Sequence, residues 1–257
     1  RLAFFAGCFV LFSGIETLAP RRTRTQTRTS RWVTNWAIVL LDTATLRLVA
    51  LAMPLLAVGA ALDAEAQGWG LMNALDLPMG LSVIATVLIF DLAIWAQHLV
   101  THKVPLLWRF HRVHHADRDF DVTTAIRFHP VEIAFSMLLK IGLVYLLGPP
   151  AIGILIFEII LNGTALFNHA NIRLPLRLDA VVRRVLVTPD MHRVHHSHLR
   201  PEHDSNYGFA LSIWDRLFGT YVAQPSCGHD DMTIGLEWQD DRPSRLIWAL
   251  TLPFRRK

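Results

Sequence analysis

Eight histidines in this sequence fall into three clusters whose spacing suits metal binding. They are His98 and His102 in an H-x-x-x-H pattern, and His111, His114, His115, His192, His195 and His196 in two H-x-x-H-H patterns. In a helix, residues three and four apart lie on the same face, so each cluster can direct several imidazoles toward one point. Three such clusters in one chain indicate a metal site far more strongly than a single H-x-x-x-H pattern would.

The number of histidines predicts two metal ions, because one ion takes about four to six ligands. Imidazole binds zinc, copper, iron and nickel, so the ligands alone do not select the metal. No H-E-x-x-H pattern supplies the glutamate base of a metalloprotease. The clusters lie at the ends of apolar segments, which argues against the midplane site of a metal transporter. An oxygen-activating pair of metals, a membrane zinc hydrolase and a non-catalytic metal-binding membrane protein all stay open.

The composition indicates a membrane protein. Hydrophobic residues make up 52% of the chain, charged residues only 18%, and the mean hydropathy is +0.33. Average soluble domains carry about 25% charged residues. The net charge of +4 comes from arginines in short blocks beside apolar runs, which favours membrane anchoring over nucleic-acid binding. Cys8 and Cys227 are the only cysteines, so we expect neither a disulfide framework nor a thiolate metal site.

Several apolar segments are long enough to place the histidines at a membrane surface. They are residues 1–18, 33–61, 77–100 and 131–168, the last interrupted by Gly148-Pro149-Pro150. The prolines predict a tight hairpin whose two arms can each just cross a hydrocarbon core of about 30 Å. The run at 1–18 is expected to be a retained helix rather than a signal peptide, because its arginines follow it. The fold class is therefore all-α, an integral-membrane helical bundle of four to five spans with a histidine-rich di-metal cap.

The charges between the segments predict an orientation. The loop at 19–31 carries five arginines and is expected on the cytoplasmic side, whereas the acidic loop at 63–76 is expected outside. Following the spans from there places every histidine cluster, and also His169, at the cytoplasmic face. The short apolar run at 246–254 is too brief to span and is expected to be interfacial or packed.

Ordered motifs along nearly the whole chain resemble the sterol desaturase/fatty acid hydroxylase superfamily of integral-membrane di-iron oxygenases. They are DLAIWAQH (91–98), HLVTH (98–102), LWRFHRVHH (107–115), RFHPVE (127–132), FNHANI (167–172), TPDMHRVHHS (188–197) and NYGFALSIWDRLFGTY (206–221). Glu16, Pro20 and Asn35 also fit the amino-terminal pattern of the family. Leu99 departs from it, since many members carry arginine after the first histidine. That departure bears on the substrate side rather than on metal binding.

The resemblance implies that the eight clustered histidines are metal ligands and adds His169 as a ninth. It makes His129 a tenth candidate, as a ligand or as a residue that supports one. Asp91 precedes His98 by two helical turns, so it could accept a hydrogen bond from that imidazole, although an acid inside a span can also pair with another helix. Asn171 and Asp190 lie beside ligands and are weaker candidates for the same supporting role, as is Glu132.

The resemblance also implies a function. It is oxygen-dependent hydroxylation or desaturation of a sterol, fatty acyl or related lipid, with two iron ions as cofactor and zinc as a substitute in preparations. Electrons are expected from an external ferredoxin or cytochrome with its reductase, because the chain has no dinucleotide or haem-attachment motif. Residues 1–257 are expected to form a single membrane domain. It comprises amino-terminal spans at 1–61, a catalytic core at about 85–221 and a cytosolic tail at 222–257.

Overall fold

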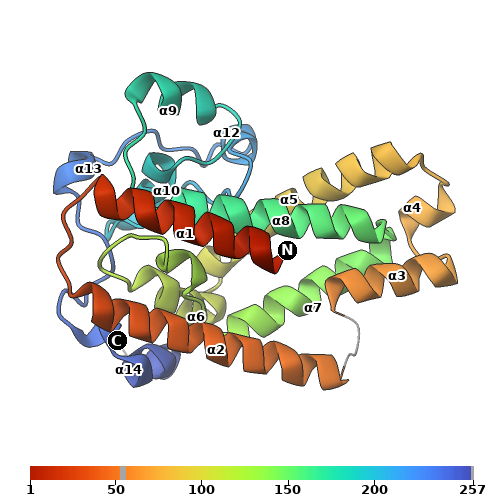
Figure 1. Cartoon of the computed structure of the whole chain (residues 1–257), viewed down its shortest axis with the longest axis horizontal. Coiled ribbons are helices and arrows are strands. Elements are labelled where there is room, and N and C mark those ends of the chain that lie inside the picture. Colours follow the sequence, from red (N-terminus) through yellow and green to blue (C-terminus); the bar gives the residue numbers. More distant parts are fainter. Residues whose placement is uncertain (53–55, 256–257) are drawn as a thin grey trace.

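The computed structural model describes residues 1–52 and 56–255, and within these ranges the chain is helical and contains no strands. Four helices are long and apolar enough to cross a membrane: α2 (Arg28–Ala52), α5 (Met79–Lys103), α7 (Pro130–Leu147) and α8 (Ala151–His169). Helix α1 (Leu2–Leu18) is apolar but shorter, and it lies along α8 (Figure 1). The predicted all-α membrane bundle is confirmed.

The predicted hairpin is formed by α7 and α8. Gly148 ends α7 in the left-handed conformation at φ 62°, and Pro149 and Pro150 lead into α8. The turn packs closely on a second glycine, because a Cβ atom built on Gly70 would lie 2.1 Å from the Gly148 nitrogen. Side chains at either glycine would therefore force the α7–α8 turn away from the segment before α4 (Leu71–Ala74).

The apolar run at 33–61 does not form a single span. Helix α2 ends at Ala52, and a separate helix, α3 (Ala57–Gln67), packs against α7 and α8. Ala57, Ala60, Ala61 and Ala64 form the buried face of α3, and these small side chains allow close approach between helices. Hydropathy identified this run as apolar, but hydropathy does not show where a long apolar run changes direction.

The main apolar core lies between α3, α5, α7 and α8. Phe90 on α5 and Phe157 on α8 are fully buried there, with ring centroids 5.3 Å apart. This core holds the spans together at a distance from the histidines, which lie at one end of the bundle. Figure 1 shows that end near α6 (Pro105–His115) and α10 (Pro189–His195), with α3, α4 and the hairpin turn at the other.

Short helices complete the cap around the histidines. They are α9 (Leu176–Val182), α11 (Arg200–His203), α12 (Ile213–Leu217), α13 (Gly228–Asp231), α14 (Leu246–Thr251) and the 3₁₀ helices η1 (Thr124–Ile126), η2 (Arg242–Ser244) and η3 (Leu252–Phe254). The run at 246–254 was expected to be either interfacial or packed, and it is packed. Trp248, Ala249 and Leu252 are buried against α2 and α6.

A buried ion network ties the start of α2 to the loop after α6. The Arg31 guanidinium is fully buried and donates to both carboxylate oxygens of Asp117, at 2.7 and 2.8 Å, and to Asp121 at 2.5 Å. Asn35 donates to Asp117 and accepts from Arg127 at 2.7 Å. The polar start of an otherwise apolar helix is thereby fixed beside the cap.

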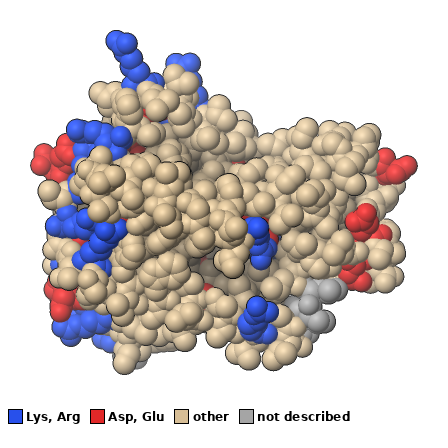
Figure 2. All heavy atoms as spheres, in the orientation of Figure 1, with Lys and Arg blue, Asp and Glu red and all other residues tan. Residues whose placement is uncertain are grey.

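Charge is distributed unevenly along the molecule. Most Lys and Arg side chains in Figure 2 gather at the cap end, whereas the opposite end, around α3 and α4, shows only acidic ones. This separation agrees with the pattern from which the orientation was predicted. The cytoplasmic placement of the cap stays a prediction.

Candidate metal centre

Besides α5 and α8, three helices carry side chains of the centre, and each of the three begins with a proline. Pro105, Pro130 and Pro189 occupy the first turns of α6, α7 and α10. Proline is favoured there because its fixed φ suits a helix and the missing N–H would have no partner within the helix. These local signals fix where each helix begins, and so which face its side chains present.

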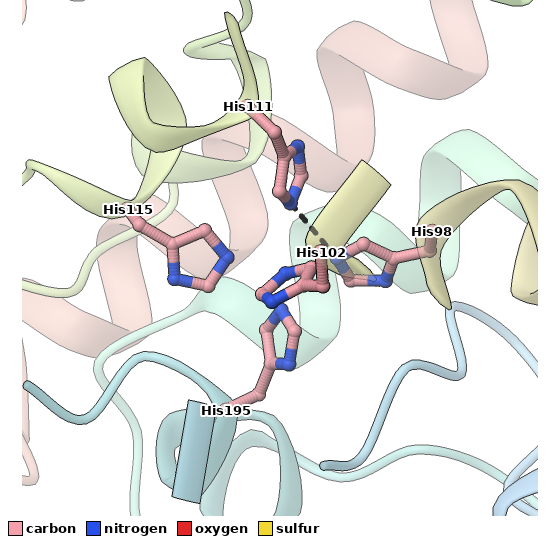
Figure 3. A group of neighbouring side chains, drawn as sticks. All are labelled: His98, His102, His111, His115 and His195. Carbon is pink, nitrogen blue, oxygen red and sulfur yellow. Dashed lines mark hydrogen bonds between the residues drawn. The ribbon is translucent and has the colours of Figure 1, made fainter. Parts of the chain in front are cut away.

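Nine histidines converge into two groups of buried side chains. The first group is His98, His102, His111, His115 and His195, and the second is His114, His169, His192 and His196. Within each group the facing ligand atoms all lie within 4.8 Å of one another. Figure 3 shows the first group, in which the five rings from α5, α6 and α10 surround a common point. All nine histidines predicted as ligands are thus brought together.

Both H-x-x-H-H patterns contribute to both groups. In α6, His115 joins the first group and His114 the second. At the end of α10, His195 joins the first group, and His196, the residue directly after the helix, joins the second. Neighbouring residues in a helix point about 100° apart, so one short helix can serve two adjacent centres. The repeated H-x-x-H-H pattern therefore supplies ligands to two adjacent histidine groups.

The hydrogen bonds of the first group show which ring nitrogens are free. Nδ1 of His98 lies 2.7 Å from the Tyr207 carbonyl, Nδ1 of His195 lies 2.6 Å from the Ser205 carbonyl, and Nδ1 of His111 lies 2.7 Å from the Glu132 carboxylate. These oxygens accept hydrogen bonds, so each Nδ1 carries the proton and donates it. Each Nε2 then presents a lone pair to the interior of the group.

Lone pairs that face one another are the arrangement expected of a cation-binding site. The Nε2 atoms of His98 and His111 are 3.0 Å apart (dashed in Figure 3), and neither has a proton to share. Nε2 of His195 and both ring nitrogens of His102 and His115 are buried without a hydrogen-bond partner. Buried polar atoms are rarely left unpaired, because each costs about 1–3 kcal/mol. A metal ion would satisfy these nitrogens together.

The second group repeats the arrangement. His169 donates from Nδ1 to the Ala165 carbonyl at 2.8 Å, so its Nε2 presents a lone pair. That atom lies 3.2 Å from Nε2 of His114 and 3.1 Å from Nε2 of His192. Both ring nitrogens of His196 are buried and unpaired. These donor atoms also fit a metal ion, and imidazole suits iron and zinc alike.

Aromatic side chains enclose the two groups. Phe128 stacks on His114 with ring centroids 4.4 Å apart, and Phe120 lies 5.0 Å from His196. Among the histidines outside the membrane-spanning helices, burial holds the pKa of His115 and His196 well below the ordinary value, and neighbouring imidazoles lower it further. The neutral form, which is the form that binds metal, is therefore favoured.

Metal binding and stability are expected to fall together as the pH is lowered. Because the folded pKa values lie below about 6.5, the unfolded chain takes up protons first, so the stability present above that pH is lost on acidification. Each such histidine lowers the free energy of unfolding by about 1.4 kcal/mol per pH unit. The test is to measure the amount of bound metal and the denaturation midpoint from neutral pH to about pH 5. If both stay constant over this range, the expectation is wrong.

The expected supporting residues are placed differently. Asp91 accepts hydrogen bonds from the Leu211 nitrogen and from Trp214 Nε1, at 3.2 and 2.8 Å, rather than from His98. The partners of Asp91 therefore come from the start of α12 and the loop before it, rather than from the ligand two helical turns away. His129 belongs to neither group, because its Nδ1 accepts from the Val131 nitrogen and caps α7.

Asn171 and Asp190 also bind elsewhere. Asn171 exchanges hydrogen bonds with the backbone of Arg22, and Asp190 pairs with Arg193 and Arg21. Both tie the segment around the arginine loop to the cap. Neither residue contacts a ligand imidazole directly, so each can support the ligands only by positioning the backbone to which it is bonded.

Three supporting contacts were not predicted. The carbonyls of Ser205 and Tyr207 accept from ligand imidazoles, and Asp204 lies 3.5 Å from Nδ1 of His102. Carbonyl oxygens carry no residue-specific signal, so sequence could not point to them. Asp204 directly follows the short helix α11, and the return of this segment toward α5 appears only in the fold.

A cavity of about 320 Å³ reaches the first group from the membrane-spanning helices. His98 and His111 line one part of it, and side chains from α1, α2, α5, α7, α8 and η1 line most of the rest. The cavity is a space in which a lipid chain could contact the first group of histidines.

Fold and site together define an integral membrane protein with a buried, histidine-rich site of the kind that binds metal ions. The profile of the fatty acid hydroxylase family matches residues 83–220, more than half of the chain, and the chain belongs to that family. The predicted resemblance is confirmed.

Curated relatives match the same region. An ornithine lipid hydroxylase, OlsE, of Rhizobium tropici is 32% identical over 160 residues, which cover 61% of this chain and 46% of the relative. Human alkylglycerol monooxygenase is 30% identical over 139 residues, 52% of this chain and 29% of that protein. Human cholesterol 25-hydroxylase is 28% identical over 141 residues, 54% and 50% of the two chains. The matches thus span about half or less of these relatives. No solved structure matches the chain significantly.

Proposed function

We propose that this protein is a membrane lipid hydroxylase whose two histidine groups hold two iron ions. The observation that carries the proposal is the convergence of Nε2 lone pairs from His98, His111 and His195 in one group and His169 in the other. The nine histidines are the proposed ligands. The supporting comparison is that the relatives described above are named as lipid hydroxylases or monooxygenases. These names favour hydroxylation over desaturation.

The proposed reaction inserts one oxygen atom of dioxygen into a lipid C–H bond and reduces the other to water. This balance requires two electrons and two protons from outside. Bound iron would supply the activation of dioxygen that such a bond needs. The chain's own residues do the rest: imidazoles hold the ions, Glu132 and the backbone carbonyls fix the rings, and the aromatic side chains exclude water.

We propose that the substrate binds in the cavity beside the first group. Its walls are mainly apolar around Ile94, Phe128 and Phe209, which suits a chain entering from the bilayer. Because His98 and His111 line the cavity, a bound lipid would lie beside the first group. Replacement of bulk water by lipid there would keep reactive species from side reactions.

We propose that the electrons arrive at the cap from a separate donor protein, a ferredoxin or a cytochrome. A groove of about 560 Å³ lies beside the first group. Its basic lining residues are Lys103, Arg109, Arg112, Arg200 and Arg255. At its base, Trp108 stacks on His203 with centroids 5.3 Å apart and lies 4.8 Å from the ring of His102. An acidic donor would meet complementary charge close to a ligand.

Purified protein should contain two iron ions and consume dioxygen when iron, reductant and lipid are supplied. Lipids from cells with and without the gene should differ by one added oxygen atom, read by mass spectrometry. Loss of two hydrogens instead would identify a desaturase. Zinc alone, with no oxygen consumption after iron loading, would overturn the oxygenase and favour a zinc-bound hydroxide acting in hydrolysis.

A further inference from the structure

Two short helices of the cap expose an apolar surface that no other part of the described chain covers. Leu176 of α9 is 81% exposed, and Leu217, the last residue of α12, is 70% exposed. Phe218, directly after α12, is 51% exposed. The same two segments, 173–187 and 211–219, also expose Leu178, Val181, Val185 and Ile213. We call these seven exposed side chains the α9–α12 patch. Apolar residues that form one exposed surface mark an interaction site, whereas scattered ones do not.

Hydrogen bonds join α12 to the end of the α9 segment. The Ser212 nitrogen donates to the Val185 carbonyl at 2.9 Å, and Ser212 Oγ donates to the Arg183 carbonyl at 2.7 Å. The Arg216 guanidinium donates to the same Arg183 carbonyl at 3.0 Å. Figure 1 shows α9 and α12 near each other at the cap end, above α1 and α8 in that view. The exposed side chains of the two segments therefore belong to one surface.

The place at which α12 contacts the bundle indicates that this surface reaches the bilayer. Trp214 Nε1 donates to Asp91 of α5 at 2.8 Å, and Phe218 stacks on Trp95 of α5 with ring centroids 4.6 Å apart. Asp91 and Trp95 lie 12 and 16 residues after Met79, the end of α5 remote from the histidines, which is about 18 and 24 Å at 1.5 Å per residue. A hydrocarbon core is about 30 Å thick. The patch is thus continuous with the surface of a membrane-spanning helix.

The exposed charges of the two segments are all positive. Arg177 and Arg184 of the α9 segment and Arg216 of α12 are exposed. Both acids of these segments, Asp179 and Asp215, are buried and have partners inside the protein. Apolar side chains mixed with arginines, with no exposed acid, complement a membrane leaflet that carries negative charge.

We propose that the α9–α12 patch is a binding site for the anionic phospholipids of the leaflet around the cap. Leu217 and Phe218 enter the acyl region beside α5, and the guanidinium groups of Arg177 and Arg184 donate to lipid phosphates. A leaflet of zwitterionic lipid would cover the apolar side chains but would bring no net negative charge to the arginines. The site lies on the outer surface of the cap, and the inference does not depend on the proposed reaction.

The first experiment measures whether the patch enters the bilayer. In a chain that carries Cys8→Ser and Cys227→Ser, Leu217→Cys places the only thiol in the patch, where it takes a bimane label. The full-length, metal-loaded protein is reconstituted in phosphatidylcholine nanodiscs. Phosphatidylcholine brominated on its acyl chains should quench this label more strongly than aqueous iodide does. Asp231→Cys is the matched control, because Asp231 is exposed on α13 at the outer end of the cap, and iodide should quench its label more strongly.

The second experiment measures lipid preference with the Leu217→Cys label. Brominated phosphatidylglycerol and brominated phosphatidylcholine are added separately, each as the same minor fraction of the lipid. Phosphatidylglycerol should be enriched near the label about fivefold or more, the contribution of one arginine at an anionic surface, and added salt should reduce the enrichment.

Arg177→Gln combined with Arg184→Gln should remove most of the enrichment. The matched control removes the same charge elsewhere on the cap, through Arg242→Gln combined with Arg245→Gln, whose guanidinium groups pair with Asp240 and Asp241. This control should keep the enrichment. An unchanged metal content shows that each variant is folded, and Val181→Cys provides a second label position if Leu217→Cys disturbs the fold.

Three outcomes would overturn the inference. Stronger quenching of the patch label by iodide than by brominated acyl chains would mean that the patch faces water. Protection from both quenchers would mean that a protein, such as a second copy of this chain, covers it. Equal quenching by the two brominated lipids, or equal loss of enrichment in both arginine variants, would mean that the patch does not select anionic lipid.

Discussion

Replacing His195 with alanine is expected to abolish oxygen-dependent oxidation of the lipid and to lower the iron content of the protein. His195 presents its Nε2 lone pair to the first group, and its Nδ1 proton is held by the Ser205 carbonyl at 2.6 Å. Alanine removes the ligand atom and leaves the other four imidazoles facing an incomplete site. Because both ions are needed for the proposed reaction, loss at one group should remove essentially all turnover.

Iron content per chain and product formation by mass spectrometry would measure this effect. The matched control is His198→Ala, three residues further on, since His198 is exposed and lies outside both groups. It should retain iron and activity. Full activity in the His195→Ala protein would remove this histidine, and the first group as assigned, from the mechanism.

Replacing Arg31 with methionine should destabilise the protein by about 3–5 kcal/mol, because it leaves buried carboxylates without their cation. Asp117 and Asp121 are each about 1% exposed, and Arg31 provides the hydrogen bonds that compensate their burial. Methionine keeps much of the side-chain length but none of the charge. The loop after α6, which follows His114 and His115, should loosen first.

The free energy of unfolding of the metal-loaded protein in mild detergent, from denaturant titration, checks this expectation. Arg47→Met is the matched control, because Arg47 is an exposed charge on the same helix and exposed substitutions usually change stability by less than about 0.5 kcal/mol. Equal stability of the two variants would mean that the buried network contributes nothing net. A larger loss at Arg31 with iron still bound would show that the network supports the fold rather than the metal.

Much of the site was predictable because spacing within helices is a local property. Once the helices form, their geometry fixes the relative directions of the side chains in each pattern. This holds for His98 with His102 and for the two H-x-x-H-H patterns. His169 required the resemblance, since a single histidine at the end of a span has no spacing to identify it. The division of the nine between two groups depends on how α6 and α10 cross, and that is a tertiary property.

The fold was predicted less completely. The Gly148-Pro149-Pro150 turn was evident, because proline and glycine act on the local backbone. The separation of α2 from α3 was missed, since the end of α2 and the start of α3 both lie within one apolar run. Asp91 shows the same limit: helical periodicity chose its face correctly, but Trp214, distant in sequence, determines its partner. The predicted domain boundaries, orientation and electron donor stay predictions.

The two adjacent histidines at the end of each H-x-x-H-H pattern have a consequence for how the protein acquires its metal. His114 and His115 share one helix but serve different groups, and His195 and His196 do the same across the site. An ion captured in either group would fix both short helices, and so would order ligands of the other group before a second ion arrives. We therefore expect loading to be cooperative, with a coupling free energy between the two sites. When metal is scarce, the protein should divide into complete and empty molecules, with the half-filled form the least populated.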